Sequence, residues 1–318
     1  MTTTPLVSIG VASFNNSPYI RETLDSIRAL DYPQVELIII DDLSTDDSVS
    51  VIEKWLLEHT DFNARLIRHT QNQGVCRVCN RFIEESRGKY LCLIGSDDNY
   101  LPDKLTVQVM MLEAAPPDVG VVFSDVSKID SAGNIIVPSV YATGQISPSS
   151  GDVWLSMLRT NFIGAMTTLV RRSCFEVVGP YDESLAYEDW DMWIRLARKF
   201  HFIYQPQVTA HYRIHGSSAM FRRRAQIAET NLRIVSKHLG VSAEGDAIIH
   251  EHIAAFSEQL YLLGGENRVY WLQQRWRQKR DLRGLALLTL ARMGVSAQHV
   301  ARTYDLIKRV RGTETIAG

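Results

Sequence analysis

The sequence predicts an α/β fold in which a mostly parallel sheet is flanked by helices, followed by a C-terminal helical extension. Over residues 1–125, short β-branched runs alternate with amphipathic helical patterns, and this alternation is typical of βαβ units. From Arg222 onward the pattern is helical, with glycine breaks. A length of 318 residues fits about two folding units.

Five strands are predicted in the first part, each a short run rich in β-branched or aliphatic residues. Val35–Ile40 is the clearest, because an uninterrupted apolar run between Pro33 and two aspartates is typical of a parallel strand buried on both faces. The predicted strands are Leu6–Ala12, Val35–Ile40, Ala64–Ile67, Lys89–Ile94 and Val119–Phe123.

Helices are predicted between these strands, with start signals at each. Ser44–Asp47 supplies several N-cap side chains for the second helix, and Pro residues open the first and fourth. The four helices start near Pro18, Ser44–Asp47, Gly74 and Pro102, and the third and fourth end near Gly88 and Leu112.

The alternation stops after residue 125. Ser131–Asn134 predicts a hairpin turn, and residues 138–151, rich in Pro, Ser and Gly, predict a loop over one rim of the sheet. Tyr187–Lys199 predicts a helix, whereas His201–Arg213 predicts short strands broken by Pro206.

Composition excludes several classes of protein. With 45% hydrophobic and 22% charged residues and a mean hydropathy of −0.10, the chain is neither disordered nor an integral membrane protein. The N-terminus lacks the basic segment of a secretory signal, and four cysteines do not make a disulfide framework. We therefore expect a cytoplasmic protein.

Charge is distributed unevenly along the chain. Residues 1–220 hold 18 Lys and Arg against 27 Asp and Glu, whereas residues 221–318 hold 16 against 9. We therefore predict an acidic domain over 1–220 and a basic helical extension over 221–318, with different functions.

Polar groups follow the predicted strands, where open parallel sheets bind ligands. Paired acids at such strand ends repel each other unless a cation lies between them, and a divalent metal with phosphates would meet that need. The alternative is that these acids only cap helices and turns. The groups are Ser13-Phe14-Asn15, Asp41-Asp42, Asn72-Gln73-Gly74 and Ser96-Asp97-Asp98.

Five segments, in order from about Leu6 to Met220, resemble the family-two inverting glycosyltransferases of bacterial polysaccharide and glycan synthesis, which have the GT-A fold. The resemblance implies a nucleotide-sugar-binding half over 1–125 and an acceptor half over 126–220. The segments are VSIGVASFNNSPYIRETLDSI, VELIIIDDLSTDDS, NQGVCRVCNRFIEESRGKYLCLIGSDDNYLPDKL, GPYDESLAYEDWDMWIRLA and HYRIHGSSAM.

The resemblance implies transfer of a sugar from a nucleotide-linked donor, with UDP favoured, to a hydroxyl of a glycan or lipid-linked saccharide, assisted by Mn²⁺ or Mg²⁺. It places Phe14 near the nucleobase and Asp42 as acceptor of the base N–H. Asp98 would ligate the metal, and Asp97 would hold the ribose or a metal-bound water. The remaining donor-binding residues are Ser13, Asn15, Asn72, Gly74, Ser96 and Arg213.

His215 is predicted to close the site near the metal or the diphosphate, with Gly216-Ser217-Ser218 as a loop over the donor. The alternative is an exposed loop histidine. Arg213 could contact phosphate or pair with an acid of the site.

Inverting transfer also needs a base that deprotonates the acceptor hydroxyl. Glu188, Asp189 and Asp191 are candidates on one predicted helix. Asp191 has Arg195 four residues on, which favours an ion pair. Asp189 has no such partner and matches the second acid of the family's motif, so it is the predicted base, with Glu188 and Asp191 as alternatives.

Three positions depart from the family pattern. Leu43 replaces a usual glycine, Gly95 replaces a frequent acid, and Cys79 replaces a frequent arginine. They leave open a second function, a non-catalytic subunit that binds sugar nucleotides or glycans.

Other readings have less support. Cys76-x-x-Cys79 lies inside a predicted helix without a second cysteine pair, so zinc or redox chemistry is not favoured. No phosphate-binding glycine motif of dinucleotide or P-loop enzymes is present. The segment 268–283 has six Lys and Arg among aromatic residues; it predicts peripheral contact with the inner face of a membrane, or packing in a homo-oligomer, but no nucleic acid.

Overall fold

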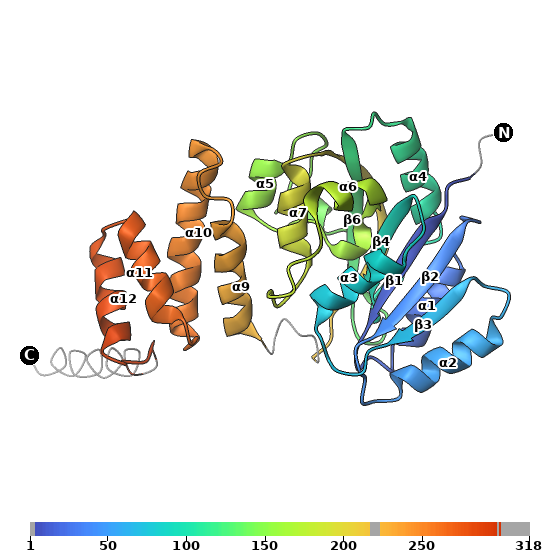
Figure 1. Ribbon diagram of the computed structural model, residues 1–318, viewed down its shortest axis with the longest axis horizontal. Helices are drawn as coiled ribbons and strands as arrows, with labels where there is room; N and C mark the ends of the chain where they lie inside the picture. The colour runs from blue at the N-terminus through green and yellow to red at the C-terminus, as the bar shows by residue number, and fades with distance from the viewer. Residues whose placement is uncertain (1–3, 217–222, 298, 300–318) are drawn as a thin grey trace, which may run out of the picture. The chain divides into compact units, whose positions relative to one another are not determined.

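The computed structural model describes residues 4–216, 223–297 and 299, and the chain divides into two compact units between Gly216 and Ser217. The first unit is a mixed α/β unit, which confirms the predicted fold class (Figure 1). The predicted domain boundary at residue 220 lies outside the described residues.

The first unit is built on one sheet with the order β3-β2-β1-β4-β8-β6-β9-β5, and β7 pairs with β6. The four strands β3, β2, β1 and β4 are parallel, and antiparallel pairs enter beyond β4. The strands are β1 Val7–Ser13, β2 Val35–Asp41, β3 Ala64–Arg68, β4 Tyr90–Gly95, β5 Asn99–Tyr100, β6 Val119–Ile129, β7 Ile135–Val137, β8 Leu169–Arg171 and β9 His201–Arg213.

Helices cover both faces of this sheet. Alternate residues of β1, such as Ile9, pack with α1, α2 and α4 in one apolar core. On the other face Gly10 meets α3, where an added Cβ would lie 2.6 Å from the Phe82 ring. The helices are α1 Ile20–Arg28, α2 Ser48–Glu58, α3 Val75–Glu85, α4 Lys104–Ala114, α5 Trp154–Arg159, α6 Arg172–Val178 and α7 Asp189–Ala197.

The five predicted strands and four connecting helices are confirmed, with ends shifted by a few residues. Val119–Phe123 was predicted too short, since β6 continues to Ile129. There it forms a hairpin with β7, and the turn at Ser131–Asn134 is closed by the Asp130 amide, which donates to the Asn134 carbonyl.

The prediction for His201–Arg213 was wrong, because this segment is one 13-residue strand. Pro206 does not interrupt β9, because it lies at an irregularity in the pairing with β6. The register steps from Gln205 opposite Ser124 to Val208 opposite Asp125. Proline is tolerated at such a bulge, because the bulged residue need not donate to the ladder.

The second unit is helical, as predicted, over its described residues. Gly240 and Gly264 end α9 and α10 with left-handed backbone conformations. Its helices are α9 Arg224–Ser236, α10 Ala243–Leu262, α11 Arg268–Gln278 and α12 Leu282–Arg292. The predicted helical pattern beyond residue 299 lies outside the described residues. None of the described helices has the length and apolar character needed to cross a bilayer.

Candidate active site

The carboxyl ends of β2, β1 and β4 lie side by side, because Ser13 is in register with Asp41 and Ala12 with Gly95. The Ser13 hydroxyl donates to Asp41 Oδ2 at 2.9 Å. The predicted polar groups after these strands therefore share one rim of the sheet, as expected for parallel strands.

A distant segment reaches the same rim through strand pairing. β9 runs antiparallel to β5, with His211 opposite Asn99. This pairing brings residues 211–215 against Asp97 and Asp98. The sequence separation is more than a hundred residues, so only the sheet topology places them together.

Asp98 is buried, with 3% of its surface exposed. Its Oδ1 accepts the Arg213 backbone N–H at 2.9 Å, while Oδ2 accepts no hydrogen bond within the described part of the chain. Burial, and then the charge of Asp97, raise the pKa of Asp98 well above its usual range. The Arg213 N–H bond and the Arg213 charge lower the pKa of Asp98 only in part.

His215 is buried and its Nε2 lies 2.8 Å from Asp97 Oδ2. The histidine thus joins the acidic pair through Asp97, and its ring also packs on Tyr19 with centroids 5.0 Å apart. The alternative, an exposed loop histidine, is wrong because His215 is buried. Of its predicted loop, Ser217 and Ser218 lie outside the described residues.

Arg213 is 1% exposed and all three guanidinium nitrogens are bonded within the protein. Nε donates to the Asp97 carbonyl at 2.8 Å, and the other nitrogens donate to Glu22 and to the Asp130 carbonyl. The guanidinium also stacks over Tyr19. Arg213 is therefore paired with an acid, Glu22, which was not among the predicted site residues, and its contact with a donor phosphate stays a prediction.

Hydrogen bonds to Asp42 connect the rim with the start of α3. Its carboxylate accepts the Gln73 and Gly74 backbone N–H groups at 2.9 and 2.7 Å, and Oδ1 lies 2.8 Å from His69 Nδ1. The Asn72 amide donates to the Asp42 carbonyl. A carboxylate offers about four acceptor sites, so the predicted bond to a nucleobase N–H would use the last.

Two non-glycine residues on the rim have left-handed backbones, Asn15 with φ 53° and Leu43 with φ 65°. The Asn15 amide donates to Ser44 Oγ at 2.9 Å, which joins the two loops. Phe14 and Leu43, which precede these bonded residues, are 43% and 44% exposed. Leu43 thus keeps the backbone conformation suited to the family's glycine but adds an apolar side chain.

Ser96, a further predicted residue, has an internal partner on the rim, and Gly95 precedes it. Ser96 is buried and accepts the side-chain amide of Asn16 at 2.9 Å. At Gly95, an added Cβ would lie 2.8 Å from Asp97 Oδ1. The departure at this position therefore leaves room for the Asp97 carboxylate.

The predicted base lies at the first turn of α7, where the Asn161 amide donates to Asp189 Oδ1 at 2.9 Å. Burial, and then the charge of Glu188, raise the pKa of Asp189 to about 8. Burial also raises the pKa of Glu188. Asp191 is buried and its Oδ2 lies 2.8 Å from Arg195 Nε, which is the predicted ion pair.

Tyr212 shows that the two groups of acids converge. Burial and then the charges of Asp98, Asp97 and Asp189, in that order, together raise the pKa of its hydroxyl to about 12. Carboxylates perturb a phenol appreciably only at short range. Acids from the rim and from α7 therefore both act on the charge of one side chain.

The environment of the cysteine pair does not favour metal or redox chemistry. All four cysteines are free and buried. Burial, with help from Glu188, raises the pKa of the Cys76 thiol to about 12. The thiolate needed for either chemistry is therefore disfavoured.

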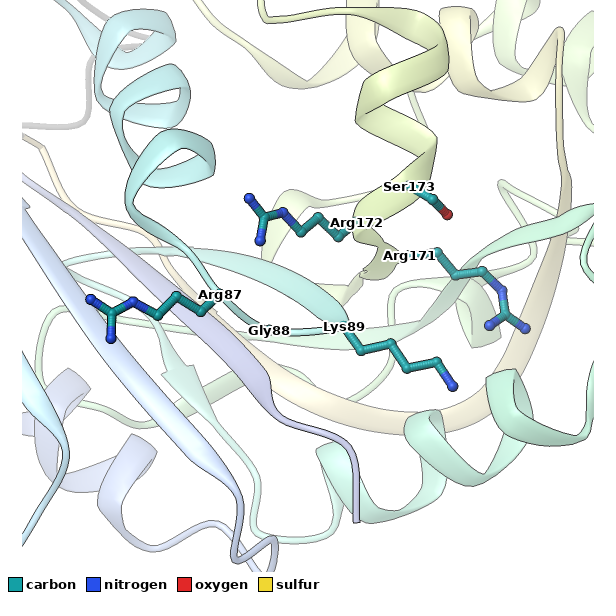
Figure 2. Close-up of a pocket in the computed structure, with 6 residues that line it drawn as sticks. All are labelled: Arg87, Gly88, Lys89, Arg171, Arg172 and Ser173. Carbon is teal, nitrogen blue, oxygen red and sulfur yellow. The ribbon is translucent and has the colours of Figure 1, made fainter. Parts of the chain in front are cut away.

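Sequence reasoning missed Glu22, Asn161, His69 and Tyr19, which bond or pack against the predicted residues. A different feature, the basic pocket lined by Arg87, Gly88, Lys89 and Arg171–Ser173 (Figure 2), lies at the opposite rim, because residues 87–89 precede β4 and Arg171 ends the antiparallel β8. It contains none of the predicted site residues.

Comparisons with known proteins agree with this fold. A GT-A mannosyltransferase of Pyrobaculum calidifontis, solved with GDP-Man and Mn²⁺, has a TM-score of 0.62 at 20% identity, covering 95% of this chain and 84% of that one. TarS of Staphylococcus aureus, residues 1–349 solved with UDP-GlcNAc, has a TM-score of 0.58 at 15% identity, covering 91% and 92%. The fold is therefore that of GT-A glycosyltransferases.

Residues 8–138 match the family described as Glycosyl transferase family 2. This match agrees with the resemblance that the motifs indicated. An uncharacterized glycosyltransferase of Rickettsia prowazekii is 28% identical over 67% of this chain and 65% of its own length. TuaG of Bacillus subtilis, provisionally described as a teichuronic acid biosynthesis glycosyltransferase, is 27% identical over 53% of this chain and 63% of its own length. The match therefore spans about two thirds of these relatives.

Proposed function

We propose that this protein is a metal-assisted inverting glycosyltransferase that moves a sugar from a nucleotide-sugar donor, most simply a UDP-sugar, to a hydroxyl of a glycan or lipid-linked saccharide. The observation that supports it best is the convergence of Asp97, Asp98 and Asp189 around Tyr212. This relationship supports a metal-type acidic pair and a base-type carboxylate that act in one site.

The residues present fit a divalent cation. Asp98 is a buried residue whose Oδ1 accepts the Arg213 N–H, and His215 is held on the adjacent Asp97. No three acidic, histidine or cysteine side chains of the described chain are gathered as a protein-only metal site. Mg²⁺ and Mn²⁺ commonly complete their shell with waters and substrate phosphates. When bound, the ion would neutralise charge on the leaving diphosphate.

Asp189 has the environment that a general base needs. A pKa of about 8 keeps it a competent proton acceptor near neutral pH. The acceptor hydroxyl would give its proton to Asp189 as its oxygen attacks the anomeric carbon, and the bond to the diphosphate breaks on the opposite face. One displacement inverts the configuration.

The nucleobase would lie over the loops after β1 and β2. Phe14 and Leu43 are the exposed apolar side chains there, and the Asn15–Ser44 bond fixes the loops on which they stand. Beside these loops, the Asn72 side-chain amide donates a hydrogen bond to the Asp42 carbonyl. These contacts favour a stacked, partly apolar base site.

The test is release of nucleoside diphosphate from a panel of nucleotide sugars with Mn²⁺ or Mg²⁺, with and without glycan acceptors. Asp98→Ala and Asp189→Ala should abolish turnover while the protein stays folded, and Asp103→Asn, an exposed acid at the start of α4, should retain it. The product's anomeric configuration, measured by NMR, tests inversion. Tight donor binding without hydrolysis or transfer would instead support the non-catalytic binding subunit.

A further inference from the structure

Helix α12 has apolar side chains on two sides. One side, with Leu288 and Ala291, is buried against Tyr261 of α10 and Leu272 of α11. On the other side, Leu282 is 87%, Leu285 42% and Met293 71% exposed. At about 100° per residue these three lie within one narrow sector, together with the exposed Ala286 and Thr289. We call this sector the outer face of α12.

A cluster of cations begins immediately before the outer face. Arg277, Lys279 and Arg280 are exposed at the end of α11 and in the connection to α12, and no ion pair involves them among the described residues. Arg283 follows Leu282 and is 71% exposed. We call these four residues the basic loop. Leu282, the most exposed large apolar side chain described, lies within it.

The acids near the basic loop are already engaged. Asp281 accepts the Gly284 N–H as helix cap and pairs with the buried Arg275. Glu258 pairs with Arg275 and Arg283. Because internal contacts satisfy both carboxylates, the loop presents a net positive surface in a fixed conformation.

We propose that the basic loop and the outer face of α12 bind an anionic membrane surface. The cations suit acidic lipid headgroups, and Leu282 and Leu285 suit insertion at the boundary with the acyl chains. A protein interface is less suited to this composition, because interface cores are rich in aromatic residues and poor in lysine. One short face gives weak binding, so the attachment should be reversible and sensitive to salt.

The test is co-sedimentation of the full chain with vesicles of phosphatidylcholine alone or mixed with phosphatidylglycerol, at low and high salt. We expect binding only to the mixed vesicles, weakened by salt. Lys279→Glu with Arg280→Glu should lower partitioning by at least about 25-fold, because two cations are lost at about fivefold each, and Leu282→Ser with Leu285→Ser should lower it at least tenfold. The matched controls are Leu57→Ser and Lys54→Glu, since these α2 side chains are 78% and 75% exposed; they should bind like the wild type.

Several results would overturn the proposal. Absence of wild-type binding, or equal binding to both vesicle types, would exclude an anionic membrane surface as the binding partner. A smaller particle mass for Leu282→Ser with Leu285→Ser, by light scattering, would identify a second copy of the chain as the occupant. A melting temperature lowered by several degrees would show that the chain itself covers the face, because truly exposed sites change stability little. Donor hydrolysis, measured in parallel without vesicles, tests the proposed function separately.

Discussion

The side-chain amide of Asn161 donates a 2.9 Å hydrogen bond to Asp189 Oδ1. The loop that carries Asn161 is anchored to α7 by two indoles, because Trp190 Nε1 donates to the Met157 carbonyl and Trp193 Nε1 to the Ile163 carbonyl. The proposed base is therefore oriented by a neutral donor that favours its ionised form, against burial and Glu188, which favour the protonated form.

We predict that kcat/KM for transfer rises with pH and levels off above about 8. Only ionised Asp189 accepts the proton, and its pKa is raised to about 8. Asn161→Ala should move the midpoint up by about one pH unit, since it removes a hydrogen bond to the charged form. Glu188→Gln should move it down. The pH profiles of the three proteins, measured at saturating metal, check this. Identical midpoints in all three would exclude Asp189 as the titrating base.

The same pKa predicts a pH dependence of stability. Because folding raises the pKa of Asp189 from about 3.9 to about 8, its contribution to stability is full at low pH and is lost as pH rises through 8. Asp189→Asn stays neutral and avoids this loss. Its melting temperature relative to the wild type should therefore increase between pH 5 and pH 8. A constant difference over that range would contradict the raised pKa.

Asp98→Asn separates catalysis from folding. We expect transfer to fall about a hundredfold or more, as when a group that stabilises transition-state charge is removed. The free energy of unfolding should stay the same or rise, since the variant removes a buried charge whose pKa is raised by burial. Chemical denaturation, calorimetric titration of Mn²⁺ and turnover check the three effects. Retained metal-dependent turnover would place the metal elsewhere.

The rim could be predicted from sequence because each polar group directly follows a strong strand pattern. Asp41-Asp42 comes after a run of buried apolar residues, and parallel strands bring their carboxyl ends to one edge. Local patterns were enough for the first four strands and helices. They failed at Pro206, because whether a proline ends a strand or lies in a bulge depends on the partner strand, β6.

The supporting residues could not be predicted for a related reason. Glu22 and Arg213 are 191 positions apart, and Asn161 and Asp189 belong to segments without a shared repeat. Nothing in the spacing indicates these pairs, because they arise from the antiparallel pairing of β9 with β5 and from the tryptophan anchors of α7. The rim was therefore predictable, whereas the contacts that orient it were not.

Arg213→Met should destabilise the segment that carries Asp97 and Asp98, because the Arg213 side chain holds the Asp97 backbone carbonyl. The variant removes charged hydrogen bonds to Glu22 and to the Asp97 carbonyl, so the free energy of unfolding should fall by about 2–3 kcal/mol. Mn²⁺ affinity should fall as well. Glu22→Gln should cost less than half as much, because that side chain is 53% exposed. Denaturation and metal titration of both variants check this; equal losses would show that Arg213 acts only through Glu22.

Substitutions at Leu43 should separate backbone strain from ligand contact. Leu43→Gly relieves a φ of 65° and should raise the free energy of unfolding by about 1 kcal/mol. It should also lower nucleoside diphosphate affinity about tenfold, since an apolar contact to the base is lost. Leu43→Ala is the matched control, because it loses the same contact but keeps a Cβ in the strained conformation. It should therefore lose affinity without gaining stability. Denaturation and calorimetric titration with Mn²⁺ check both variants, and unchanged affinity in both would place the base away from Leu43.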